Sequence, residues 1–284
     1  MTQGTPPAGP LPMWTPVPVP VQAPAREAVA ELPGTKLWFW DTGGSGHPVI
    51  LLHAATQSGA GWVYQQPVLA AAGFRAVGYS RRGYYRSDPG DPADPGYASE
   101  DLDNLIQYLK LDRVDLVAAA HGGFFALDYA LNYPKRVRSL TIVSSLMGVT
   151  DADYQVINDR LRPKFFAALP HDFQELSPSY RAGNPAGLAA WQELTHQAMP
   201  GPRLYPKVKE PMTWARLETI RHPTLLVTGE SDLYTPPSLL RLQALHMPHA
   251  EVATIPEAGH SPYWEQPDVF NRLLLGFLSR QAAG

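Results

Sequence analysis

The stretch of the chain that says most about chemistry is residues 114–127, VDLVAAAHGGFFAL. It starts as a short apolar run, turns through small residues and continues with the pattern of an amphipathic helix. This order is typical of a buried parallel strand that leads into a helix. The corner at 118–123 has the small-x-nucleophile-x-Gly-Gly pattern of a nucleophile elbow, a sharp turn that lifts one side chain clear of the sheet. Ala120 occupies the nucleophile position, and alanine has no nucleophilic atom.

The elements that would position this corner alternate between apolar runs and helical patterns. Besides the strand and helix above, strand patterns fall at 36–42, 48–53, 75–80, 137–145, 223–229 and 250–256, and helical patterns fall near 62–72, 98–111, 236–246 and 267–280. Such alternation predicts an α/β fold with a parallel sheet, helices on both of its faces and right-handed crossovers.

Composition divides the chain into three parts. Residues 1–30 form a proline-rich arm, because the prolines of its first 24 residues favour extended polyproline II over helix. Residues 31–145 and 221–284 carry the alternating pattern of the core. Residues 146–220 break that alternation with helical stretches, aromatic residues and scattered prolines, so we expect an inserted helical cap there.

Ligands bind outside the carboxyl ends of the strands in an open parallel sheet, and four loops at such ends carry informative residues. One of these loops is the elbow, and through the four loops together the chain resembles the α/β-hydrolase superfamily. The resemblance is to the capped group that includes esterases, lactonases, epoxide hydrolases and carbon–carbon hydrolases, and it covers about residues 36–282. It implies the α/β-hydrolase fold, with a mostly parallel central sheet, helices on both faces and an inserted helical cap.

The resemblance also implies an acid and a base. GESDLYTPP (229–237) matches the acid loop of the family, where the spacing favours Asp232 over Glu230, although an aspartate there could instead cap a helix. EAGHSPYWEQP (257–267) matches the histidine loop, with His260 as general base. A buried carboxylate at Asp232 would orient the imidazole and stabilise its charged form.

The fourth loop, LLHAATQSG (51–59), lies where the family has its oxyanion loop. The resemblance assigns the two oxyanion-hole donors to the backbone N–H groups of Ala55 and His121, and two such amides stabilise a developing negative charge. Ala54 replaces the glycine usual in this loop. His53 is expected to pack beneath the loop.

Three hypotheses account for the alanine at position 120. In the first, the chain is a serine hydrolase of an apolar ester or lactone, or of a carbon–carbon bond, in which the native serine has been replaced by Ala120 through engineering. In the second, His260 and Asp232 form a base dyad for cofactor-independent lyase or oxygenase chemistry, as in some relatives. In the third, the hydrolase scaffold serves as a non-catalytic ligand-binding protein. The two retained members of the triad favour the first hypothesis.

Four aromatic residues are candidates for substrate contact. Tyr84 and Tyr234 follow predicted strands, and Phe165 and Trp191 lie in the predicted cap, where packing of the cap core is the alternative role. An aromatic cap with few charges predicts a small apolar organic substrate. Ser144 follows a strand without an elbow around it, so it is not expected to be a nucleophile, and Arg82 is expected to belong to the scaffold.

The composition excludes other classes of site and partner. The chain of 284 residues has a net charge of −3, which gives no reason to expect a nucleic acid or an anionic membrane as partner. It has no cysteine, no apolar run of membrane-spanning length and no visible secretory signal. We expect a cytoplasmic protein, with a mature secreted form as the alternative. Without a metal-ligand cluster, phosphate loop or dinucleotide fingerprint, no metal or other cofactor is expected.

The arm leaves the oligomeric state open. Its expected role is a flexible or surface-hugging extension. The alternative is a homo-oligomer in which the arm packs on a neighbouring subunit, because Met13, Trp14 and the valines give it apolar surface to bury.

Overall fold

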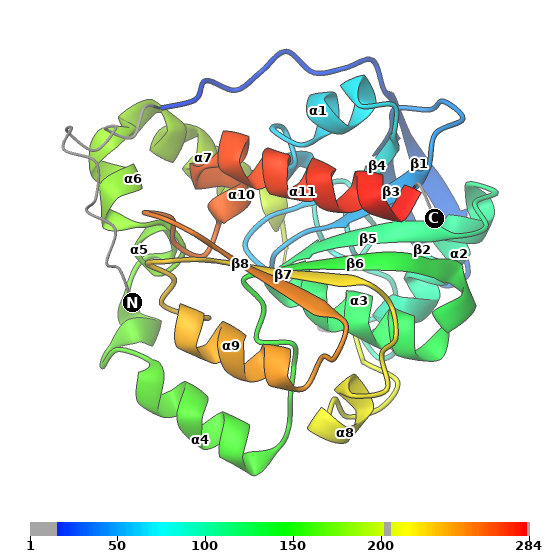
Figure 1. Cartoon of the computed structure of the whole chain (residues 1–284). Coiled ribbons are helices and arrows are strands. Elements are labelled where there is room, and N and C mark those ends of the chain that lie inside the picture. Colours follow the sequence, from blue (N-terminus) through cyan, green and yellow to red (C-terminus); the bar gives the residue numbers. More distant parts are fainter. Residues whose placement is uncertain (1–15, 202–205, 283–284) are drawn as a thin grey trace.

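An eight-stranded sheet forms the centre of the computed structural model, which describes residues 16–201 and 206–282 (Figure 1). The strand order is β1-β2-β4-β3-β5-β6-β7-β8; β1, β2 and β4 pair antiparallel in turn, and all other neighbours are parallel. The strands are β1 (Arg26–Leu32), β2 (Thr35–Asp41), β3 (Pro48–Leu52), β4 (Arg75–Tyr79), β5 (Val114–Ala119), β6 (Val137–Val143), β7 (Thr224–Gly229) and β8 (Ala250–Ile255).

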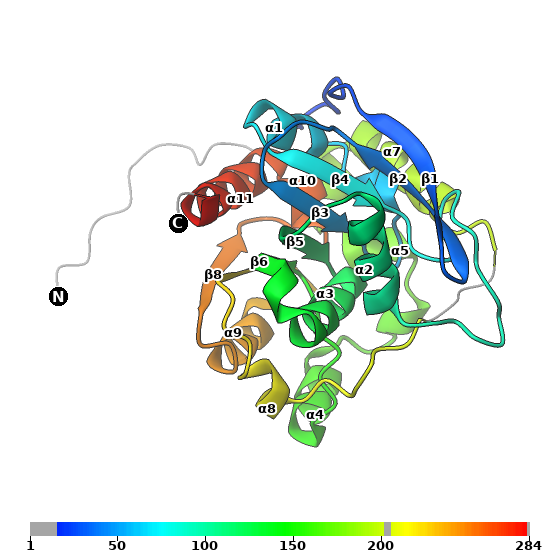
Figure 2. The same cartoon turned by 90° about the vertical axis from the view of Figure 1, so that its right-hand side faces the viewer.

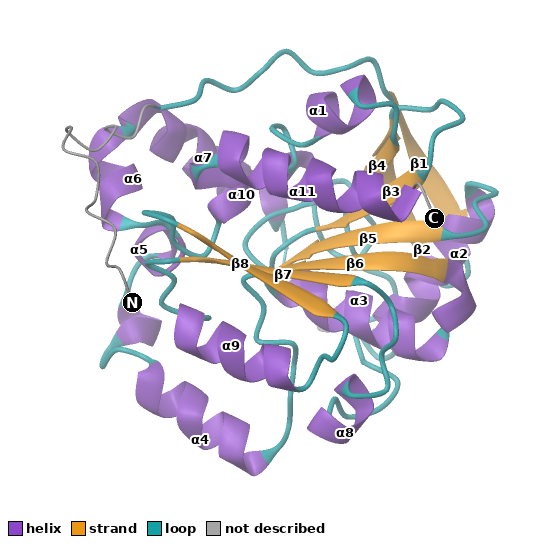
Figure 3. Cartoon of the chain, viewed as in Figure 1, coloured by secondary structure: helices purple, strands orange, loops and turns teal. Residues whose placement is uncertain are grey.

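Helices lie on both faces of this sheet (Figure 3). The α-helices are α1 (Gln66–Ala71), α2 (Ala98–Tyr108), α3 (His121–Asn132), α4 (Ala152–Leu161), α5 (His171–Glu175), α6 (Pro178–Gly183), α7 (Pro185–Ala198), α8 (Trp214–Leu217), α9 (Pro237–Leu245), α10 (Pro262–Glu265) and α11 (Pro267–Ala282). Three 3₁₀ turns are η1 (Gly59–Gly61), η2 (Pro134–Arg136) and η3 (Phe166–Ala168). The predicted mostly parallel α/β architecture is confirmed.

The sheet has a buried core on each face, which is why its central strands are apolar throughout. Every residue of β5 and β7 is buried. On one face α2, α3 and α9 supply core side chains, and on the other α1, α10 and α11 do so (Figure 2). Continuous apolar runs are the pattern expected for parallel strands that are covered on both sides.

The first strand lies partly inside the range predicted as the arm, so the arm ends earlier than residue 30. β1 begins at Arg26 and pairs antiparallel with β2 along its whole length. As an edge strand it is largely exposed and carries charged residues, so it lacks the apolar run by which the other strands were predicted.

The described part of the arm lies along its own chain. The hydroxyl of Tyr64 donates to the carbonyl of Val17 (2.8 Å), and Ala23 exchanges two hydrogen bonds with the side chain of Gln66 (2.8 and 3.0 Å). Met13 and Trp14 lie outside the described residues, so the predicted contact of the arm with another subunit stays a prediction. None of the helices in the described ranges combines the length and the hydropathy needed to cross a membrane.

Residues 146–220, predicted as a cap, contain helices α4 to α8. Helices α4 to α7 gather at one side of the molecule in Figure 1. α8 instead packs on the core, where Trp214 stacks on His246 with 4.0 Å between ring centroids.

Candidate active site

The strand β5 runs into helix α3 through one strained residue. Ala120 has φ 48° and ψ −114°, a conformation that costs a residue with a Cβ about 1–3 kcal/mol. Its N–H donates to the carbonyl of Val143 (2.8 Å), and its own carbonyl accepts from Gly123 (3.0 Å). The strand-to-helix turn at Ala120 is therefore sharp and strained, as a nucleophile elbow would require.

Two glycines allow α3 to begin so close to the sheet. A Cβ at Gly122 would lie 2.4 Å from the carbonyl oxygen of Leu52, and one at Gly123 would lie 2.5 Å from Oγ of Ser145. Any larger residue would push the helix away from β3 or β6. The sharpness of the corner thus depends on Gly122 and Gly123.

Replacing Ala120 by glycine should stabilise the protein by about 1 kcal/mol, because the strain of a Cβ at positive φ exceeds the entropy that glycine loses on folding. The comparison is urea unfolding followed by circular dichroism. The matched control is Ala119→Gly, one residue earlier in β5, which should be destabilising because it only loosens a strand. Equal losses of stability in both variants would show that residue 120 stores no strain.

The predicted acid and base meet at the carboxyl edge of the sheet. Nδ1 of His260 lies 2.9 Å from both carboxylate oxygens of Asp232. Asp232 also accepts from the backbone N–H of Tyr234 (2.7 Å) and Thr235 (2.9 Å) and from the hydroxyl of Thr228 (2.9 Å). A carboxylate with these donors holds the proton of His260 on Nδ1 and leaves Nε2 to act as base.

The pair also changes the acidity of both groups. Burial alone would raise the pKa of Asp232, but the charge and hydrogen bond of His260, with the amides of Thr235 and Tyr234, lower it below its ordinary value. Burial alone would lower the pKa of His260, but the charge and hydrogen bond of Asp232 raise it above its ordinary value. Asp232 is thus held as the anion, and the imidazolium is stabilised.

A second buried carboxyl fixes the loop that carries His260. Glu265 accepts from the backbone N–H groups of Gly259 (2.9 Å), Ser261 (3.4 Å) and, from the cap, Ser177 (2.8 Å). Burial raises the pKa of Glu265 to about 7 even though these amides oppose it. The backbone around His260 is therefore held both by α10 and by the segment predicted as the cap.

The predicted oxyanion donors and Ala120 line the same cavity. Ala55 and His121 both line the cavity described below, and His121 is the first residue of α3, where the helix dipole favours negative charge. The hydroxyl of Tyr84 donates to the carbonyl of Ala55 (3.1 Å) and so supports the loop. His53 is buried, and its Nε2 accepts the N–H of Arg81 (3.1 Å).

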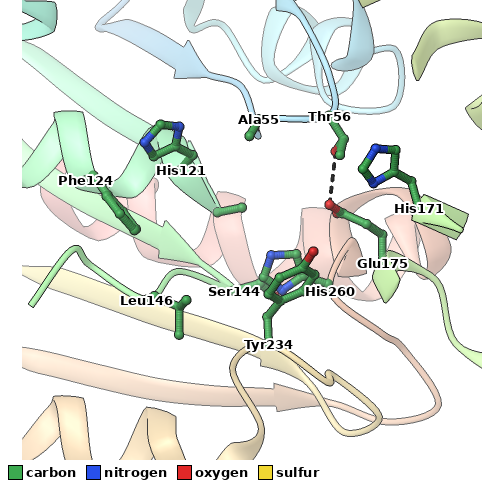
Figure 4. A pocket seen from close by; sticks show the side chains of 11 residues that line it. Ala55, Thr56, His121, Phe124, Ser144, Leu146, His171, Glu175, Tyr234 and His260 are labelled. Carbon is green, nitrogen blue, oxygen red and sulfur yellow. Dashed lines mark hydrogen bonds between the residues drawn. The ribbon is translucent and has the colours of Figure 1, made fainter. Parts of the chain in front are cut away.

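These groups surround a cavity of about 260 Å³ (Figure 4). Its lining includes the predicted site residues Ala55, Ala120, His121, Tyr234 and His260. The ring of Tyr234 packs on that of His260 with 4.3 Å between centroids, and its hydroxyl donates to Gln174 Oε1 (2.7 Å). The rest of the lining is Thr56, Phe124, Ser144, Leu146, His171 and Glu175.

Three predicted substrate contacts lie outside this lining. The side chain of Tyr84 is buried with its hydroxyl on the carbonyl of Ala55, and that of Trp191 is buried in the core cluster on the face of the sheet covered by α1, α10 and α11. Phe165 is 84% exposed, on the turn that precedes η3. The sequence shows that these residues are aromatic but does not show whether their side chains point toward the cavity. They could therefore not be distinguished from Tyr234 by sequence.

Several lining residues were not predicted. Phe124 lies one helical turn after Ala120, and Ser144 follows β6, the neighbour of β5. Because ligands bind at the carboxyl ends of parallel strands, both residues could have been predicted. Thr56 follows Ala55 in the oxyanion loop. His171 and Glu175 come from the cap helix α5 and stand in no recognisable motif. Among the described residues, no group of three or more His, Asp or Glu side chains is arranged to hold a metal ion.

Comparison with known proteins identifies the family of the chain. A model described as the alpha/beta hydrolase family matches residues 49–273. The chain is 30% identical over 250 residues to a protein named "Putative carbamate hydrolase RutD" from Caulobacter sp. (strain K31), covering 83% of this chain and 91% of that protein. It is 24% identical over 274 residues to 2-hydroxy-6-oxo-6-phenylhexa-2,4-dienoate hydrolase of Burkholderia cepacia, covering 83% and 89%.

Solved structures show the same fold. Est816, described as an N-acyl homoserine lactone degrading enzyme, superposes with a TM-score of 0.70 at 28% identity and covers 88% of this chain and 100% of its own. These similar proteins bear the names of hydrolases or of a lactone-degrading enzyme.

Proposed function

The chain belongs to the alpha/beta hydrolase family, and we propose that its site is that of a serine-type hydrolase for an apolar ester or lactone, in which Ala120 stands where the active enzyme has serine. A carbon–carbon bond next to an activated ketone is a substrate of the same chemical kind. With alanine at this position the chain would bind such a substrate without forming an acyl-enzyme.

The observation that carries this proposal is the backbone of Ala120. The residue keeps a strained conformation whose effect is to lift a side chain toward the cavity, although its methyl group has no chemistry to perform. The base, its carboxylate and the oxyanion loop lie around the same point. A site that had lost its hydrolytic use would be expected to relax this strain or lose one of these groups.

With serine at position 120 the residues would act in a fixed order. The serine hydroxyl would attack the scissile carbonyl while Nε2 of His260 takes its proton, and Asp232 would stabilise the resulting imidazolium. The N–H groups of Ala55 and His121 would hold the negative oxygen. His260 would return the proton to the leaving group, and water activated by the same imidazole would release the acid.

The cavity supports a small and largely apolar substrate. Phe124, Leu146 and Tyr234 supply its apolar wall. The relatives' names include a carbamate, a phenyl-substituted oxo-dienoate and an N-acyl homoserine lactone, and each of these compounds contains a carbonyl group. We propose the same type of reacting group here.

Fluorophosphonate labelling of the Ala120→Ser variant tests the proposal. We expect one adduct on the introduced serine, seen by intact mass and peptide mapping, and none in the chain as it stands. An Ala120→Ser protein that is folded by circular dichroism but takes up no label would show that the site is not built for acyl transfer.

A second candidate function follows from the same base. His260 and Asp232 are assembled, and Nε2 of His260 is left for the cavity, without any nucleophile at position 120. Such a dyad could abstract a proton in cofactor-independent lyase or oxygenase chemistry. Absence of labelling in folded Ala120→Ser would favour this candidate.

A further inference from the structure

A cap carboxyl that has no part in the acyl-transfer scheme lies inside the cavity. Glu175 is the last residue of α5, its exposure is 4%, and it lines the cavity together with Thr56 and His260 (Figure 4). Its backbone carbonyl accepts the N–H of His260 (2.7 Å). Glu175 therefore connects the cap to the loop of the catalytic base.

One oxygen of this carboxyl is satisfied and the other is not. Oε1 accepts the hydroxyl proton of Thr56 (3.1 Å), which anchors the side chain beside the oxyanion loop. Oε2 is buried and has no hydrogen-bond partner among the described residues. A buried polar atom without a partner is unfavourable, so a ligand that supplied a hydrogen bond would be bound more tightly.

The surroundings of Glu175 favour its neutral form. The titratable groups that act on it are His260, Asp232 and His171, and Tyr263 of α10 is close enough to be affected by it. Burial raises the pKa of Glu175, which His260 and the bond from Thr56 only partly oppose. A neutral carboxyl has one O–H, and with Oε1 already accepting from Thr56, Oε2 is the oxygen that can donate.

We propose that Glu175 determines substrate specificity by donating a hydrogen bond from Oε2 to an acceptor oxygen that the substrate carries beside its scissile carbonyl. This inference rests on the proposed function, since it takes the carbonyl to lie between Ala55 and His121. Thr56 adjoins Ala55, so an oxygen within a few bonds of the carbonyl can reach Glu175. The substrate class is thus an ester or lactone with a nearby ether, keto or ring oxygen.

Calorimetric binding to the chain as it stands tests this without catalysis. The probes are methyl α-methoxyphenylacetate and methyl 2-phenylbutanoate, which differ by an ether oxygen in place of a methylene. At the lowest pH at which the chain stays folded, the ether should bind roughly five- to tenfold more tightly, the value of one hydrogen bond. Near pH 9 the preference should vanish, because ionised Glu175 no longer donates and repels the ether oxygen.

Substitutions at Glu175 separate donation from other roles. Glu175→Gln keeps an N–H donor, so its ether preference should persist at both pH values. Glu175→Leu removes the donor, and the two esters should then bind equally. Glu230→Gln, the same change at an exposed residue near Asp232, should match the parent chain.

Two results would overturn the inference. One is an ether preference that survives in Glu175→Leu, or that is lost in Glu175→Gln while the parent keeps it near pH 9. The other is no binding of either ester at millimolar concentration. Failure of the proposed function is seen separately, as a missing adduct in Ala120→Ser.

Discussion

Replacing Asp232 by asparagine in the Ala120→Ser background is expected to slow fluorophosphonate labelling by roughly 10³- to 10⁴-fold. Asp232 accepts from Nδ1 of His260 and from the amides of Tyr234 and Thr235. An asparagine amide group turned toward Nδ1 would donate instead, so the imidazole would carry its proton on Nε2 and could not act as base. The rate is read from intact mass over time.

The pH dependence of the same reaction gives an independent check. Only neutral His260 accepts a proton, and its pKa is raised above the ordinary value of about 6.5. Labelling of Ala120→Ser should therefore rise with pH through a midpoint above that value, and Asp232→Asn should move the midpoint down because the carboxylate charge is gone.

The control for this variant is Glu230→Gln, again in the Ala120→Ser background. Glu230 is exposed and lies two residues before Asp232, so this change should leave the rate within about twofold. Labelling of Asp232→Asn within tenfold of the parent would contradict the assignment of Asp232 as the acid.

The parts of the fold that were predictable are those fixed by local pattern. β3, β5, β6 and β7 are apolar over several consecutive residues because both faces of the sheet are covered, and each appears near its predicted range. β1 was missed because an exposed edge strand owes its form to pairing with β2. The sequence of β1 itself carries no strong strand signal, whereas β2 was predicted at 36–42.

The same division holds for the site. Ala120, Asp232 and His260 were predicted because each lies in a short motif that follows a strand, and strand ends converge at one edge of a parallel sheet. Glu175 reaches the cavity only because α5 docks against the loop of His260, a contact between residues far apart in the sequence. The sequence of α5, HDFQE, contains no motif that predicts this contact.

The buried ion pair between Arg82 and Asp101 should have the largest effect on stability among the predicted changes. Nε and Nη2 of Arg82 each lie 2.7 Å from a different oxygen of Asp101, and both side chains are 7% exposed. Arg82 also donates to the carbonyl of Gly34 (3.1 Å), so it ties the loop after β4 to α2 and to the β1–β2 turn. This agrees with the scaffold role expected for Arg82.

Asp101→Ala should lower the free energy of unfolding by about 3–5 kcal/mol, because it leaves the guanidinium of Arg82 buried without its counter-charge. Urea unfolding followed by circular dichroism measures the loss. The matched control is Arg280→Ala, which breaks the pair of Arg280 and Glu251 at 2.6 Å, where both side chains are more than half exposed. Since solvent screens that pair, its loss should cost less than about 1 kcal/mol. Similar losses in the two variants would mean that burial does not set the strength of the Arg82–Asp101 pair. Recovery of stability in the double variant Arg82→Met/Asp101→Leu would show that the loss in Asp101→Ala comes from the buried, unpaired charge of Arg82.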